Sequence, residues 1–123
     1  KGEIMANPNI VNVATINGKT DVFALTTTLT NLVTAAADTV YKINTIIVSN
    51  IDGSSAADVT IKYNDGSNDR AIASTISVPA DSSLVVSDKN SQFYLEENEI
   101  IKGEASANSD LECLISYEII NDA

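Results

Sequence analysis

The sequence predicts an all-β protein, an antiparallel β-sandwich of the jelly-roll or immunoglobulin-like kind with about eight to ten strands. Short segments that alternate apolar and polar residues are separated by turn signals such as Asp52-Gly53, Asp65-Gly66 and Pro79-Ala80-Asp81. Apolar residues make up 44% of the chain, and most of them are Ile, Val, Leu and Ala. The chain contains no tryptophan. Branched side chains of this kind fit a pleated surface. We expect residues 9–123 to form a single domain, preceded by an extended arm over residues 1–8.

The first third of the chain contains three predicted strands, at residues 9–15, 21–26 and 29–34. Between the first two, Asn17-Gly18 predicts a hairpin turn because both residues tolerate positive φ. Leu and Ala residues at helical spacing leave a helix over residues 29–37 as an alternative to the third strand.

The rest of the chain alternates more regularly. Its predicted strands are Val40–Asn50, Ala57–Asn64, Arg70–Val78, Ser83–Ser87, Gln92–Leu95, Glu99–Ala105 and Leu111–Ile120. The first of these is apolar on both faces near its end, which indicates a central strand. In the strand that begins at Arg70, the alternation predicts that Ile72, Ile76 and Val78 face the core.

The chain is strongly acidic, with 17 Asp and Glu residues against 7 Lys and Arg residues and a formal charge of −10. Such a surface repels a phosphate backbone and an anionic bilayer, so we expect neither nucleic acid nor a membrane as a partner. No apolar run approaches the roughly 20 residues of a membrane span. The single cysteine, Cys113, cannot form an internal disulfide and is expected to be a small buried hydrophobe.

The amino-terminal arm is a candidate for contacts between chains. Met5-Ala6-Asn7 looks like a natural start, so residues 1–4 are interpreted as an upstream extension. The polar segment after it could extend and add a strand to the edge of a neighbour's sheet. Its interface candidates are Asn7, Pro8 and Asn9.

The sequence carries little catalytic chemistry. It has no histidine, which removes the commonest general base, and its five glycines form no phosphate-binding loop. The carboxylates Glu96, Glu97 and Glu99 could in principle form a glycosidase pair, but a solvated turn is the preferred interpretation. We therefore expect neither an enzyme nor a cofactor.

Two further groups of residues are candidate sites. Asp65 and Asp69 lie in an oxygen-rich segment that resembles part of a calcium loop, although a plain hairpin turn also explains Asp65-Gly66. Phe93 and Tyr94 are adjacent on a strand, so one of them should face outward unless both faces of the sheet are covered. The outward residue is a candidate interface anchor.

Several segments carry a likeness to a known group of proteins. They are the strand Tyr41–Asn50, the following AADVTIKY, the turn around Pro79, YLEENE and the closing strand that ends in SYEII. With the opening MANPNIVNV, these segments resemble small β-sandwich structural proteins of tailed bacteriophages, and virion proteins of marine cyanophages in particular. The resemblance implies no catalytic residues.

The resemblance implies a place on the virion. The preferred hypothesis is a capsid decoration or cement protein that binds the major capsid protein or other virion proteins. The alternative is a tail or fibre component that acts as a receptor-binding or glycan-binding module. Because long apolar strands with uncovered edges invite pairing, we also expect a homo-oligomer. A trimer would suit a threefold position of the capsid.

Overall fold

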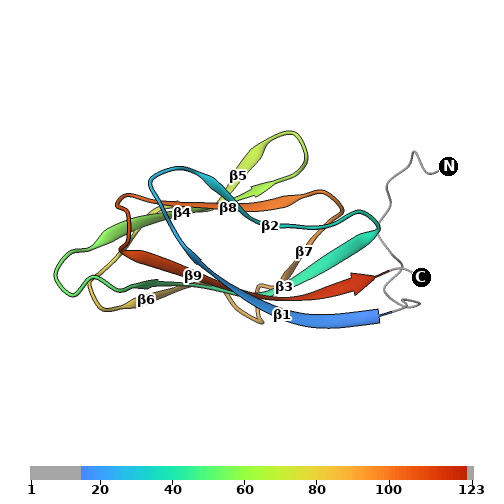
Figure 1. Cartoon of the computed structure of the whole chain (residues 1–123), viewed down its shortest axis with the longest axis horizontal. Helices are drawn as coiled ribbons and strands as arrows, with labels where there is room; N and C mark the ends of the chain where they lie inside the picture. The colour runs from blue at the N-terminus through green and yellow to red at the C-terminus, as the bar shows by residue number, and fades with distance from the viewer. Residues whose placement is uncertain (1–14, 122–123) are drawn as a thin grey trace.

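A computed structural model describes residues 15–121 as nine strands in two antiparallel sheets packed face to face, with no helix in this range (Figure 1). The strands are β1 (Thr15–Ala24), β2 (Thr30–Thr34), β3 (Thr39–Asn50), β4 (Ala57–Asn64), β5 (Asp69–Val78), β6 (Ser83–Ser87), β7 (Phe93–Leu95), β8 (Ile100–Ala105) and β9 (Leu111–Asn121). The predicted antiparallel sandwich is confirmed. Among the described residues no helix is long and apolar enough to span a bilayer.

The two sheets differ in size. One has the order β1-β9-β3-β6, with β7 also paired to β3, and the other has the order β2-β8-β4-β5. The core lies between them and is built mainly from branched aliphatic side chains of both sheets. The fully buried isoleucines are Ile43, Ile46, Ile61, Ile101 and Ile115. Removal of these side chains from water is the main stabilising contribution to the fold.

The central strand β3 contains a β-bulge. The register with β9 shifts between Ile43 and Thr45, so Asn44 is an extra residue. The bulge reverses the alternation, and Ile43 and Ile46 consequently both face the core although they are three positions apart. Beyond the bulge Ile46 and Val48 face the core and Ile47 faces outward, so this end of β3 is apolar on both faces.

The predicted hairpin at Asn17-Gly18 is wrong. Both residues lie inside β1, which pairs with β9 over ten residues without a shift in register. The long strand β9 offers a continuous row of backbone partners, and a turn at this point would lose part of that ladder. The predicted strand over residues 9–15 and the arm over residues 1–8 lie outside the described residues, apart from Thr15, which begins β1.

The helix considered over residues 29–37 is also wrong, because β2 forms there and pairs with β8. Strand β4 pairs with one edge of β8, and β2 pairs with the other edge. The backbone groups of both edges of β8 are thereby hydrogen-bonded. Val33 is buried in the core, while Leu32 packs against it from the side.

Two of the three inward residues predicted for β5 are wrong, because the register of β5 with β4 shifts twice. Ile72 and Ile76 are exposed, and Ala73 takes the buried position beside Val78. Thr75 adopts a positive φ of 52°, and its N–H donates to Thr60 Oγ1 at 3.0 Å. Because β5 is an edge strand, it tolerates such bulges.

Strand β9 turns alternate residues toward the core, with Leu111, Cys113 and Ile115 fully buried, as expected for Cys113. Burial raises the pKa of the Cys113 thiol to about 12, so it is an inert core residue. Tyr117 stacks on Tyr41 of β3 with ring centroids 5.1 Å apart. These contacts anchor β9 between its two neighbours.

Candidate interaction site

A groove opens between the edges of the two sheets. Strand β5 is the last strand of one sheet, while β6 and β7 form the corresponding edge of the other. The groove has a volume of about 410 Å³, and no charged side chain lines it. Its lining residues are Tyr63, Ile72, Val86, Ser87, Ser91, Phe93 and Tyr94. We call this feature the aromatic groove.

The floor of the aromatic groove is held rigid by Tyr63. Its hydroxyl donates a hydrogen bond to Glu99 Oε1 and lies 3.3 Å from the carbonyl oxygen of Tyr94. Its ring packs against Phe93 at a centroid distance of 5.9 Å and a tilt of 56°. Burial, followed by the hydrogen bond to Glu99, raises the pKa of Tyr63 well above its usual value. Tyr63 is therefore a neutral donor that fixes the β7 backbone.

Phe93 and Tyr94 take different environments, as their adjacent positions on a strand require. Phe93 packs against the core, whereas Tyr94 is 42% exposed at the mouth of the groove. Ser87 and Ser91 close the connection between β6 and β7, with their hydroxyl oxygens 3.1 Å apart. An exposed aromatic ring on a rigid base is a suitable anchor for a protein or ligand surface.

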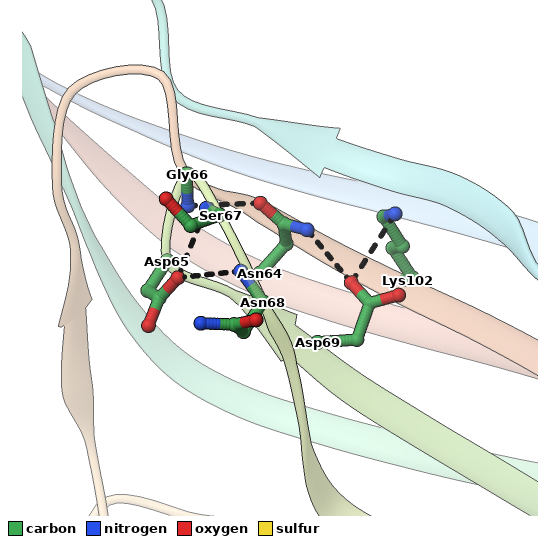
Figure 2. A network of polar contacts seen from close by, with 7 residues as sticks. All are labelled: Asn64, Asp65, Gly66, Ser67, Asn68, Asp69 and Lys102. Carbon is green, nitrogen blue, oxygen red and sulfur yellow. Dashed lines mark hydrogen bonds and ion pairs between the residues drawn. The ribbon is translucent and has the colours of Figure 1, made fainter.

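The oxygen-rich segment between β4 and β5 forms a tight turn closed by its own side chains (Figure 2). Asp65 Oδ1 accepts hydrogen bonds from the backbone N–H groups of Ser67 and Asn68, at 3.0 and 2.8 Å. Asp69 Oδ1 accepts a hydrogen bond from Asn64 Nδ2 at 2.7 Å and lies 3.2 Å from Lys102 Nζ. The predicted hairpin at Asp65-Gly66 is confirmed, and Gly66 supplies its positive φ of 98°.

The same contacts bear on the calcium hypothesis for Asp65 and Asp69. The carboxylates point to different partners, and one of them faces the ammonium group of Lys102. Within residues 15–121 no group of three or more His, Cys, Asp or Glu side chains is placed to hold a metal ion. The arrangement supports a hairpin stabilised by its own hydrogen bonds, and calcium binding there stays an untested prediction.

Replacing Asp65 with asparagine is expected to lower the free energy of unfolding at neutral pH but not in acid. Hydrogen bonds from the backbone of Asn68 and then Ser67 hold the pKa of Asp65 below its ordinary value of 3.8. A carboxyl whose folded pKa is depressed stabilises the fold above the unfolded pKa and loses that contribution as the pH falls through the folded pKa. Urea unfolding at pH 7 and at a pH below the depressed folded pKa should therefore show Asp65→Asn less stable only at the higher pH.

The matched control for this prediction is Asp58→Asn, which removes the same charge from the face of β4 opposite its buried residues. Each variant can differ from wild type in its free energy of unfolding. If that difference changed with pH equally in the two variants, a specific role for Asp65 would be contradicted. The comparison separates a local hydrogen-bond effect from the change in net charge.

The three carboxylates considered for catalysis lie on the connection between β7 and β8. Glu97 Oε2 accepts a hydrogen bond from the backbone N–H of Asp38, whose φ is 62°. Glu99 Oε1 accepts hydrogen bonds from Tyr63 and from the backbone N–H of Glu96, the latter at 2.8 Å. Two of these carboxylates thus support the loop around Asp38 and the base of the aromatic groove.

A second surface, absent from the sequence analysis, crosses the outer face of the five-stranded sheet. The register places Val22 opposite Leu114, Leu114 opposite Ile47, and Ile47 opposite Val85. Val22 and Val85, at the two ends of this row, are 61% and 55% exposed. The four residues form an apolar row across β1, β9, β3 and β6. Because they come from four separate segments, only the strand register reveals them.

No protein-family model matches the sequence, and no curated protein matches it significantly. Solved structures nevertheless share the fold. A chain from the disulfide-linked pili that Bacillus endospore appendages form is 12% identical, with a TM-score of 0.54 over 89% of this chain and 88% of that chain. A chain from the acid-stable capsid of the Helicobacter pylori bacteriophage KHP30 is 9% identical, with a TM-score of 0.53 over 91% and 92%.

At such low identities these likenesses establish the fold class and nothing finer. The chain is an antiparallel β-sandwich of a kind found both in a pilus and in a phage capsid. The match spans nearly the whole length of both partners.

Proposed function

We propose that the chain is a structural protein of a bacteriophage particle that decorates the outer surface of the capsid. The observation that carries this proposal is the fold shared with a chain of the KHP30 capsid over 91% of this sequence. The segments that resemble small virion proteins of tailed phages support the same assignment. A charge of −10 suits an outer surface, away from packaged DNA. The proposal assigns the chain no enzymatic activity and no cofactor.

The aromatic groove is the proposed attachment surface. Its lining is uncharged in a strongly acidic chain, so a shell protein can approach it without charge repulsion. Tyr94 is the proposed anchor, with Phe93 beneath it. Aromatic residues in such positions carry a large share of the binding energy of protein interfaces. The arm residues Asn7, Pro8 and Asn9 are proposed as a second contact, and they lie outside the described residues.

The test uses empty shells of the phage that encodes the chain, prepared without this protein. The chain should co-sediment with the shells and raise their melting temperature, because a ligand that binds only the folded assembly stabilises it. Tyr94→Ala should weaken binding about tenfold or more. Val85→Ala, which trims an exposed side chain of the outer face, should leave binding unchanged. Absence of binding to shells that lack the protein would refute the decoration role.

The aromatic lining also favours a second candidate, a receptor-binding or glycan-binding module of a tail or fibre. Rings such as Tyr94 and Tyr63 can pack against the apolar face of a sugar, and Ser87 and Ser91 lie beside them. This candidate predicts binding to host cells or to a glycan array, lost in Tyr94→Ala. Binding to shells without binding to cells or glycans would exclude it in favour of decoration.

A further inference from the structure

We propose that two copies of this chain pair through β1, edge to edge and antiparallel, so that their five-stranded sheets join into one continuous sheet. Among the described strands, β1 pairs only with β9, and its other edge is open. An open edge of ten residues is a template for another strand. This inference concerns self-association alone and holds whether or not the proposed place on the virion is correct.

The edge of β1 lacks most of the devices that block such pairing. It contains no proline, and its register with β9 runs from Thr15 to Ala24 without a bulge. Two of the most exposed large apolar residues of the described chain, Ile16 and Val22, lie on it at 57% and 61% exposure. Its protective features are the charges of Lys19 and Asp21, each of which must find an opposite charge in any pairing.

The direction of the backbone groups limits the register. Directly after β1, the N–H of Leu25 donates to the carbonyl of Leu111 across β9, at 2.9 Å. Backbone groups alternate in direction along a strand, so the odd-numbered residues of β1 face β9. The even-numbered residues, from Ile16 to Ala24, therefore direct their N–H and C=O groups to the open edge. Pairing must place even-numbered residues opposite even-numbered residues.

Charge selects one register among those that remain. With Thr20 opposite Thr20 of the second copy, Lys19 lies opposite Asp21 of that copy, and the reverse pair forms by symmetry. Centring the pairing on Lys19 would oppose two lysines, and centring it on Asp21 would oppose two aspartates. Within one chain Lys19 Nζ and Asp21 Oδ1 are 3.9 Å apart with both side chains partly exposed. Asp21 Oδ2 accepts a hydrogen bond from the Tyr117 hydroxyl at 2.7 Å, which leaves Oδ1 as the oxygen that can meet the lysine of a partner. Like charges directly opposite one another destabilise a sheet.

The shapes of the exposed side chains fit the same register. Val22 lies opposite Gly18 of the second copy, and Ile16 lies opposite Ala24. A Cβ atom built on Gly18 meets nothing within 4 Å, so there is space beside it for the valine side chain. Each large apolar residue thus meets a small one, and the pairing removes part of the exposed surface of Ile16 and Val22 from water. Symmetry makes both halves of the contact identical, as in an isologous dimer.

Cysteine cross-linking tests this register directly. Residues 19 and 21 would form a pair without backbone hydrogen bonds, with Cα atoms roughly 4.5 Å apart, within the range that a disulfide spans. Lys19→Cys/Asp21→Cys should therefore give a covalent dimer on mild oxidation. Neither single variant should do so, because each would place a cysteine opposite a charged residue. Wild type serves as the control for the buried Cys113.

A charge exchange provides the second measurement, by sedimentation equilibrium. Lys19→Glu should weaken the dimer about tenfold, since two symmetric attractive pairs become repulsive. Lys19→Glu/Asp21→Lys should restore the wild-type dissociation constant. Unfolding midpoints of all variants, measured in parallel, show that the monomer remains folded. A monomeric wild type at every concentration, a double cysteine variant that fails to cross-link, or an exchange that fails to restore the dimer would each overturn the proposal.

Discussion

Replacing Ile46 with alanine is expected to lower the free energy of unfolding by about 2–5 kcal/mol. Ile46 lies on the central strand β3 and has no exposed surface. It packs in the cluster that both sheets contribute to, so the atoms around it cannot close the resulting cavity completely. Because small domains have only about 5–15 kcal/mol of stability, a substantial part of the total would be lost.

The matched control is Ile76→Ala, the same substitution on the edge strand β5, where the side chain is 40% exposed. We expect it to cost about 1 kcal/mol or less. Urea unfolding followed by circular dichroism measures both, and the slope of the free energy against urea should stay unchanged. Equal losses for the two variants would contradict the placement of the core between the sheets.

The sequence alone was sufficient for the positions of most strands. From β4 onward, branched residues alternate with polar ones and Gly, Pro, Asn and Asp occupy the turns, so local preference and tertiary structure agree. The predicted boundaries of β6, Ser83–Ser87, coincide with the structure, and those of β9 differ by a single residue at Asn121. These segments have one buried face, which makes the alternation informative.

Two kinds of error arose where tertiary pairing overrode a local signal. Asn17-Gly18 has the composition of a hairpin turn, but β9 supplies a partner along the whole of β1 and keeps it extended. In β3 and β5, bulges insert extra residues and change which residues face inward, as at Asn44 and Ile72. A single sequence shows the period of a strand and not the position of a bulge in it.

The interaction surfaces were predictable only in part. The outward position of either Phe93 or Tyr94 follows from strand geometry, and the structure selects Tyr94. The groove around it also needs Tyr63 from β4 and Ile72 from β5, which approach it because of the sheet order. Sheet order depends on pairing between distant segments and leaves no local trace in the sequence. The open edge of β1 could not be predicted from the sequence for the same reason.

Replacing Gly103 with valine is the second change for which we expect a large loss, about 1–3 kcal/mol. Gly103 lies on β8 and faces the core. A Cβ atom added there would lie 2.8 Å from Leu32 Cδ1, 3.2 Å from Ile61 Cδ1 and 3.3 Å from Leu25 Cδ2. Leu32 is only partly buried and can move aside, but Ile61 and Leu25 are held within the core. The added methyl groups of valine therefore have no space without displacing a packed side chain.

Gly18→Val on β1 is the matched control, because a Cβ atom there meets nothing within 4 Å. Valine is more favourable than glycine in a strand, so this variant should be as stable as wild type or slightly more stable. Thermal and urea unfolding should be measured at protein concentrations where the chain is monomeric, since Gly18 also lies on the proposed contact. If Gly18→Val lost as much stability as Gly103→Val, close packing around Gly103 would not explain the loss there.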